Sequence, residues 1–403
     1  MKPLFLYVFL SASLFGQNVY IPDTNFKAYL VGHPGINTNG DTEIQLSEAS
    51  VFYGAINCYT LQIENLQGIE AFTALTELYC YHNNLTSIDV SQNTALEILQ
   101  CNNNQLSSLD VSQNLLLETL TCYDNQLTNL DVSQNTALEL LQFQYNQLTE
   151  LDVSACGVLQ TLDCSENKLE SLLLPNSSEL IIVQCVGNEL DALDVTNVPT
   201  LQKLELSDNL FTEIDVSNNE FLSWFLCDSN SFSSIDVTQN PYLQTFHIGY
   251  QNTMNSIDLS QNPLLRWFSC GNSAITSLDL SSNWGLQFFY CDSTKLLTCL
   301  NLQNGAGQNL IGFNALDTPE LTCIQVDNSN YFATAWESYV DNVQMFSENC
   351  ASDCTLGISS LQNTPKKCVK IIDYMGRETP FKPNTPLIYV YDDGSIEKVF
   401  SVE

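Results

Sequence analysis

Apolar residues recur along most of the chain with a fixed period of 21 residues. The repeating unit is L-x-x-L-x-C-x-x-N-x-L-x-x-L-D-V-S-x-N-x-x, and it dominates residues 75 to 302. Its first leucine occurs eleven times, with one extra residue near Gln251: Leu75, Leu96, Leu117, Leu138, Leu159, Leu180, Leu201, Leu222, Leu243, Leu265 and Leu286. A single unit of this length cannot bury its own apolar side, so neighbouring units must stack. The pattern therefore predicts a repeat solenoid of about eleven 21-residue coils.

Alternation within each unit gives every position a side. In Leu78-Tyr79-Cys80 a strand period of two places Leu78 and Cys80 inward and Tyr79 outward. The expected strands are short and parallel, one in each coil. An asparagine turns the chain after each of them: Asn83, Asn104, Asn125, Asn146, Asn167, Asn188, Asn209 and Asn230. We expect their amides to bond to the backbone of neighbouring coils, which satisfies groups that would otherwise be buried unpaired.

The half-unit L-x-x-L-x-C-x-x-N-x-L resembles the consensus of leucine-rich repeats, with Cys where many members have a third Leu. The 21-residue length is similar to that of short bacterial repeats, and the closing L-D-V-S-x-N resembles arrays in exported proteins of the Bacteroidetes lineage. The resemblance implies ligand binding on the strand-bearing face. No G-x-S-x-G, H-E-x-x-H, phosphate loop or dinucleotide fingerprint occurs in the chain, so we expect that the protein is not an enzyme.

The net charge of -34 reflects a shortage of basic residues more than an abundance of acids. Between residues 30 and 365 only Lys168, Lys203, Arg266 and Lys295 are basic. Such a surface repels phosphate, which argues against nucleic acid and anionic lipid as partners. Cations, basic proteins and neutral glycans remain.

Cysteine occupies one inward position in eight coils: Cys80, Cys101, Cys122, Cys164, Cys185, Cys227, Cys270 and Cys291. Phe143, Leu206 and Ile248 fill it in the other three. This exchange favours buried thiols that act as small apolar side chains, with a metal-binding ladder as the alternative. Beyond the last coil, Cys323 and Cys350 are candidates for a disulfide that closes a segment with an expected amphipathic helix, 331–346. Cys354 with Cys368 is a weaker pairing.

Nine outward aspartates recur at a second position of the unit: Asp89, Asp110, Asp131, Asp152, Asp194, Asp215, Asp236, Asp258 and Asp279. Leu173 and Asn301 interrupt the series. Each carboxylate is expected to cap amides near the following Ser or Asn, as in Asx turns. A row of calcium ligands is the alternative.

Residues 37–48, N-T-N-G-D-T-E-I-Q-L-S-E, resemble an EF-hand loop between possible helices at 23–30 and 47–52. Five residues fall at ligand positions of this loop: Asn37, Asn39, Asp41, Glu43 and Glu48. Asn replaces Asp at the first position, and Thr42 stands where Gly is expected. Calcium is thus the one cofactor considered, and an ordinary polar turn is the alternative.

The outward positions beside the first strand vary most from coil to coil, as a binding surface on a regular scaffold would. They include Tyr79, Tyr81, His82, Tyr123, Asp124, Tyr145, Asp163, Asp208, Asp228, His247, Tyr250, Tyr290 and Asp292. Aromatic rings among acids can stack on sugars or anchor a protein partner. The predicted function is therefore binding of a protein or polysaccharide. A structural adhesin or spacer, whose face needs only to be polar, is the alternative.

The two ends of the chain differ from the repeats. Residues 1–16 have the charge, apolar run and small-residue exit of a signal peptide. Residues 17–74 and 303–354 are expected to cap the solenoid (75–302), and 355–365 to link it to a β module, 366–403. In this module V-K-I-I-D-Y-M-G-R-E and P-L-I-Y-V-Y-D-D-G-S-I-E-K resemble the C-terminal sorting domains of the type IX secretion system. That resemblance implies contact with outer-membrane secretion machinery and a secreted or cell-surface location, without a membrane span. An ordinary terminal β module is the alternative.

Overall fold

The computed structural model describes residues 17–251, 253–305, 307–342, 345–350, 354, 368–372, 379, 387–391 and 396–399. The chain divides into two compact units, Met1–Leu356 and Gly357–Glu403. The predicted signal peptide lies outside the described residues, as does the linker.

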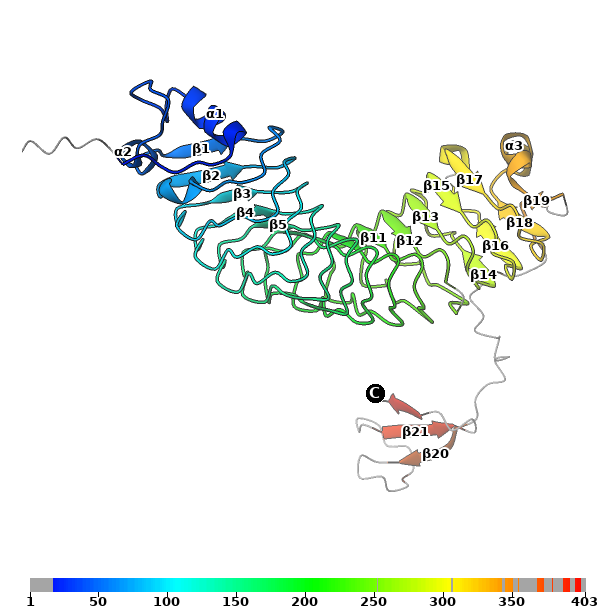
Figure 1. Cartoon of the computed structure of the whole chain (residues 1–403). Coiled ribbons are helices and arrows are strands. Elements are labelled where there is room, and N and C mark those ends of the chain that lie inside the picture. The colour runs from blue at the N-terminus through cyan, green and yellow to red at the C-terminus, as the bar shows by residue number, and fades with distance from the viewer. Residues whose placement is uncertain are drawn as a thin grey trace, which may run out of the picture. The chain divides into compact units, whose positions relative to one another are not determined.

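The first unit is built on a thirteen-stranded parallel sheet whose strands lie side by side along the solenoid (Figure 1). The strands are β1 (Gly54–Asn57), β2 (Leu75–Tyr79), β3 (Ile98–Gln100), β4 (Thr119–Thr121), β5 (Leu140–Gln142), β7 (Thr161–Asp163), β9 (Ile182–Gln184), β10 (Lys203–Glu205), β11 (Trp224–Leu226), β12 (Thr245–His247), β13 (Trp267–Ser269), β15 (Phe288–Tyr290) and β17 (Gly312–Asn314). The eleven predicted coils supply β2 to β15, and each cap adds one strand. The predicted repeat solenoid is confirmed.

The sequence period sets the register of this sheet. Leu99 pairs with Leu120, which holds the same position in the following unit, so equivalent residues lie beside one another. The extra residue near Gln251 lies in the connection between two paired strands. It does not change the strand register, because Thr245 still pairs with its equivalent, Trp267. Every inward residue thus packs on its counterpart in the next coil.

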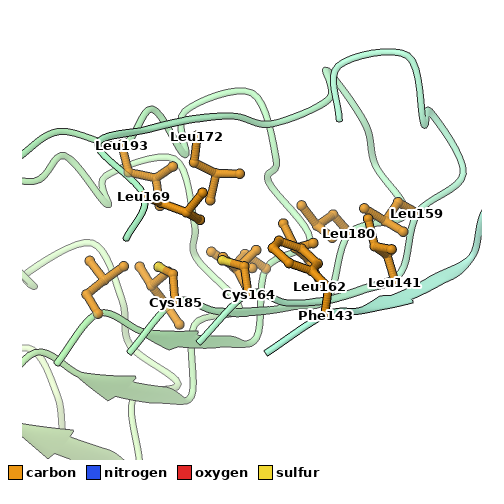
Figure 2. Packing of buried hydrophobic residues seen from close by; sticks show 14 of the residues in the cluster. Leu141, Phe143, Leu159, Leu162, Cys164, Leu169, Leu172, Leu180, Cys185 and Leu193 are labelled. Carbon is orange, nitrogen blue, oxygen red and sulfur yellow. The ribbon is translucent and has the colours of Figure 1, made fainter. Parts of the chain in front are cut away.

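These inward residues form one continuous core. Leu159, Leu162, Cys164 and Leu169 of a single coil are fully buried, and Figure 2 shows them packed beside Leu180 and Cys185 of the next. Burial of one such leucine contributes roughly 1.5–3 kcal/mol. Chain entropy offsets most of that gain, so a coil depends on its neighbours for stability.

The predicted asparagine ladder is present, as Asn125 illustrates. Its Nδ2 donates to the carbonyls of Cys101 and Cys122 at 3.1 and 3.0 Å, and its Oδ1 accepts from the Leu106 amide at 2.9 Å. A second ladder comes from the asparagine of the S-x-N segment, which the sequence analysis did not use. There Asn114 Nδ2 donates to the carbonyls of Val90 and Asn93.

The N-terminal cap contains α1 (Thr24–Gly32), α2 (Leu46–Ala49) and the short 3-10 helix η1 (Ile69–Ala71). Asp23 Oδ1 caps α1 by accepting from the amides of Asn25 and Phe26. The helix expected at 47–52 is shorter than predicted, because α2 ends at Ala49.

Further elements lie outside the main sheet. They are the paired strands β6 (Glu150–Asp152) and β8 (Ser171–Leu173), a parallel sheet of β14 (Ser277–Asp279), β16 (Cys299–Leu302), β18 (Cys323–Val326) and β19 (Met345–Ser347), the helix α3 (Ser329–Trp336), and the 3-10 helices η2 (Gly307–Asn309) and η3 (Glu337–Tyr339). The helix expected at 331–346 is wrong in extent: α3 ends at Trp336 and Phe346 lies in β19.

Two disulfides fasten the C-terminal cap. Cys323 is bonded to Cys350, with 6.0 Å between their Cα atoms. Cys299 is bonded to Cys354, with 5.3 Å between their Cα atoms. The weaker pairing of Cys354 with Cys368 is therefore wrong, because β16 brings Cys299 next to Cys354 instead.

The second unit is a three-stranded antiparallel sheet of β20 (Cys368–Ile372), β21 (Leu387–Tyr391) and β22 (Ile396–Val399). Its strands fall where the terminal β module was expected. None of the helices in the described part of the chain has the length and apolar character needed to cross a bilayer.

Candidate ligand-binding face

The strand face is the outward side of the thirteen-stranded sheet. Each coil presents three outward residues spaced two apart, the last two outward residues of its strand and the residue two positions beyond it, such as Glu77, Tyr79 and Tyr81, since strand side chains alternate. These three side chains are half-buried, because neighbouring coils crowd them from both sides.

Eight predicted site residues lie on the strand face: Tyr79, Tyr81, Tyr123, Asp163, Asp228, His247, Tyr290 and Asp292. The other five, His82, Asp124, Tyr145, Asp208 and Tyr250, stand one residue later in a turn, with φ between 52° and 58°. Coils without a predicted site residue there adopt the same left-handed conformation, for example at Glu166. Turn geometry therefore sets this exposed row, which borders the strand face.

The tyrosine patch, comprising Tyr59, Tyr79, Tyr81 and Tyr123, lies at the N-terminal end of the face. Tyr59 and Tyr81 stack with ring centroids 4.7 Å apart and planes inclined by 4°. The Tyr79 hydroxyl donates to Glu77 Oε2, and burial together with this carboxylate raises the pKa of Tyr79 to about 12. A shallow hollow of about 170 Å³ adjoins Tyr81 and Tyr123. The sequence analysis missed Tyr59, because β1 precedes the first recognisable repeat.

The tryptophan patch, comprising Glu205, Trp224, Trp267 and Tyr290, lies in the C-terminal half. Trp224 Nε1 donates to Glu205 Oε1 at 3.0 Å. Lys203 Nζ lies 3.1 Å from the same oxygen and 5.8 Å from the centroid of the Trp224 ring. Both tryptophans occupy the first outward position of their strands, which the sequence period could have identified.

Burial perturbs two ionisable groups beside this patch. Asp228 Oδ1 accepts from the Gly249 amide at 2.6 Å, yet burial raises the Asp228 pKa to about 6. Burial also lowers the pKa of His247 to about 4. The two side chains approach to 3.8 Å between His247 Nδ1 and Asp228 Oδ2. Near neutral pH the imidazole is therefore uncharged and leaves Asp228 without a compensating cation.

The cysteine series is packed as the sequence analysis predicts. All eight thiols are buried and unbonded, and Cys58 extends the series into the coil of β1. Burial raises the pKa of Cys101 to about 12, so its thiol is protonated. The interpretation as small apolar side chains is confirmed.

The aspartate row consists of turn caps. In all nine cases Oδ1 accepts from the amide two residues later, at 2.8–3.0 Å, as Asp89 Oδ1 does from the Ser91 amide. Asn301 keeps the same turn through Oδ1 and donates from Nδ2 to Asp279. Two shallow hollows, of about 540 and 370 Å³, flank the exposed Leu173, which interrupts this row.

The loop at 37–48 is closed by its own hydrogen bonds. Glu48 Oε1 accepts from the Thr38 amide and hydroxyl and from the Asn39 amide, while Oε2 accepts from Gln45. Asn37 Nδ2 donates to the Asp41 carbonyl. Glu43 pairs with Lys27 at 2.7 Å. Calcium binding by this loop stays a prediction.

The stacked parallel coils and their asparagine ladders define a leucine-rich-repeat solenoid. The family model described as leucine-rich repeats (2 copies) matches residues 73–114. Internalin J from Listeria monocytogenes serotype 4b (strain F2365) is 35% identical over 78 residues, which are 19% of this chain and 8% of that protein. The match thus spans only a small part of this relative's length.

Solved structures show the same fold over most of the chain. The functional domain of InlJ from Listeria monocytogenes, which includes a cysteine ladder, superposes with a TM-score of 0.69 at 23% identity, covering 96% of this chain and 99% of that one. A leucine-rich-repeat protein from Bacteroides eggerthii DSM 20697 has a TM-score of 0.57 at 17% identity, covering 75% of this chain and 58% of that one. At these identities the likeness shows the fold alone.

Proposed function

We propose that this protein is a non-enzymatic binding protein that recognises a protein or polysaccharide through its strand face. The observation that carries the proposal is the set of aromatic side chains on the strand face, in the tyrosine and tryptophan patches, all half-buried except the exposed Tyr59. The fold does not require aromatic residues there, because other coils have Thr161 or Gln184 in equivalent places.

Rings held in this way suit recognition. The neighbouring coils restrict their motion, so little conformational entropy is lost when a partner binds. Aromatic side chains with a polar group nearby are also the usual anchors of binding interfaces. The similarity to Internalin J supports the same class of function without naming a ligand.

We further propose that the protein acts outside the cell, in secreted or surface-attached form. The signal-peptide pattern of residues 1–16 and the resemblance of 366–403 to sorting domains support this location. The antiparallel sheet of the second unit is compatible with such a module. Fractionation of the producing cells tests the location: the chain should be found in the medium or on the surface, and a wholly cytoplasmic pool would contradict it.

An array of proteins and glycans probed with the full chain tests the binding proposal. Tyr79→Ala combined with Tyr81→Ala should abolish saturable binding, because it removes two rings of the tyrosine patch. The matched control is Tyr20→Ala with Tyr53→Ala, since those tyrosines are 71% and 74% exposed and lie outside the strands. No saturable binding to either class would overturn the proposal and favour a structural spacer.

A further inference from the structure

Two glycines interrupt one outward column of the strand face. In successive coils the residue two positions after the strand is Asp228, Gly249, Gly271 and Asp292. A Cβ atom added to Gly249 would lie 3.0 Å from Asp228 Oδ1, and one added to Gly271 would lie 3.3 Å from Asp292 Oδ1. Both carboxylates therefore lean toward the glycines, from opposite sides.

Aromatic rings line the neighbouring columns. Trp267 lies 4.9 Å from His247 and 6.5 Å from Tyr290, measured between ring centroids. The Nε2 atom of His247 and the Nε1 atom of Trp267 are buried and have no hydrogen-bond partner among the residues that the structure describes. We call this group of residues, with the two aspartates and two glycines, the Asp228–Asp292 site.

The two carboxylates lack a cation. In the described part of the chain, no lysine or arginine lies within 4.0 Å of Asp228 or Asp292. The imidazole of His247 is uncharged near neutral pH, because burial lowers its pKa to about 4. A partly buried carboxylate in this state gains more from a ligand cation than an exposed one does, since water screens it less.

The strand face already binds one cation, the ammonium group of Lys203. Lys203 Nζ lies 3.1 Å from Glu205 and 5.8 Å from the Trp224 ring centroid, so a carboxylate and an indole bind one ammonium together. Cation–π attraction adds to the ion pair in such an arrangement. Asp228 lies 3.8 Å from His247, which packs on Trp267, and Asp292 follows Tyr290 by two residues. Carboxylates and aromatic rings on this part of the face are thus offered to a cation from outside the chain.

The spacing excludes one ion held by both aspartates. Their Cα atoms lie three coils apart, which is about 14 Å at the separation of parallel strands, and the carboxylates lie somewhat closer because both lean toward the intervening glycines. Among the described residues no three His, Cys, Asp or Glu side chains converge as a metal site. An extended peptide rises about 3.3 Å per residue, so two residues four positions apart have Cα atoms about 13 Å apart. Their side chains point to the same side, and this span is close to the separation of the two aspartate Cα atoms.

We propose that the Asp228–Asp292 site binds an extended basic segment of a protein partner, with one lysine or arginine on each aspartate and the two basic positions four apart in the segment. The inference rests on the proposed function of the strand face and deepens it, because it selects a basic protein over a neutral polysaccharide. The net charge of -34 favours the approach of such a segment.

Calorimetric titration of the full chain tests this inference. The probe is a glycine-serine peptide that carries two arginines at positions i and i+4, and a peptide of the same composition with adjacent arginines is the spacing control. Asp228→Asn with Asp292→Asn should weaken binding of the first peptide by about tenfold or more. Glu189→Gln with Glu213→Gln removes the same charge from exposed positions outside the strand face and should change affinity by less than about twofold.

Equal losses in the two double variants would overturn the inference, since binding would then reflect the overall charge. Equal affinity for the two peptides, or no binding of either, would also overturn it. The proposed function fails separately, when the array gives no binding that depends on the strand face. A thermal melt of each variant confirms that it is folded.

Discussion

Asp228, in the proposed binding site, opposes folding when its carboxyl group is ionised. Burial raises its pKa to about 6, so the folded state holds the proton more tightly than the unfolded chain does. The stability associated with this proton is therefore present at low pH and is lost as the pH rises through 6. The charged and titratable groups that face it are His247, whose pKa burial lowers, and Asp208, whose charge raises the Asp228 pKa further.

Asp228→Asn should stabilise the free protein at pH 7, by roughly 1–3 kcal/mol, because the amide avoids the cost of a buried negative charge. Asparagine can still accept the hydrogen bond from the Gly249 amide. Urea denaturation at pH 7 and pH 4 measures the effect, and the gain should disappear at pH 4. A gain of equal size at both pH values would contradict the linkage to ionisation.

Asn125, unlike Asp228, stabilises the fold, because its side-chain amide bonds to the backbone of neighbouring coils. Asn125→Ala should lower the free energy of unfolding by about 1–3 kcal/mol, because it leaves the Leu106 amide unpaired inside the turn. The carbonyls of Cys101 and Cys122 each lose one hydrogen bond but still accept from Asn104 and Asn146. The neighbouring exposed Gln126 provides the control: Gln126→Ala should change stability by less than about 0.5 kcal/mol. Similar effects of the two substitutions in denaturant titrations would show that the ladder contributes little.

At the scale of the element, the repeating coils could be predicted from sequence, whereas the caps could be predicted only in part, through the helix at 23–30 and the bond between Cys323 and Cys350. The pattern of one coil occurs eleven times in the sequence, so the pattern is still recognisable where single positions differ. The outer strands β1 and β17 follow a different spacing, because Ala55 pairs with Glu77 and Phe289 with Phe313, and neither step equals the repeat length. The partner of Cys354 is likewise set by the second sheet, where β16 carries Cys299, and no spacing rule in the repeat identifies that strand.

The cysteine ladder should be unreactive as long as the coils remain stacked. All eight thiols are buried, burial raises the pKa of Cys101 and of Cys270, and the thiolate is the reactive form. Iodoacetamide should label none of the eight ladder cysteines in the native chain, and all eight after unfolding in guanidinium without reductant, as read by peptide mass spectrometry. Ladder cysteines that resist labelling after unfolding would show that they are bonded. The disulfide cysteines should require reduction first.

The N-terminal cap allows a separate test for calcium. The prediction requires that calcium displace the hydrogen bonds of Glu48 and raise the melting temperature of the full chain, since an ion that binds only the folded state stabilises it. Glu48→Gln should remove the calcium-dependent part of the shift. An identical melting midpoint in calcium and in chelator would reject the site and leave residues 37–48 as a polar turn.

For the whole molecule, the sequence predicts where the candidate face lies but identifies only some of the residues that form it. Alternation placed Asp228, His247 and Tyr290 outward in agreement with the structure. Trp224 and Trp267 occupy equivalent outward positions but were not predicted as site residues. The sequence does not show which of the variable outward side chains lie close together. The contact between His247 and Trp267 joins side chains of two neighbouring coils, and only the packed solenoid shows it.

Binding through the strand face requires that the ligand cover the aromatic side chains there. Hydroxyl-radical footprinting of the full chain, with and without the best ligand from the array, measures this for aromatic side chains across the solenoid. The account predicts that ligand protects Tyr81, Trp267 or Tyr290 while oxidation of Tyr53 and Trp284, exposed by 74% and 59%, stays unchanged. Protection confined to Tyr53 or Trp284, with the strand face oxidised as in the free protein, would contradict it.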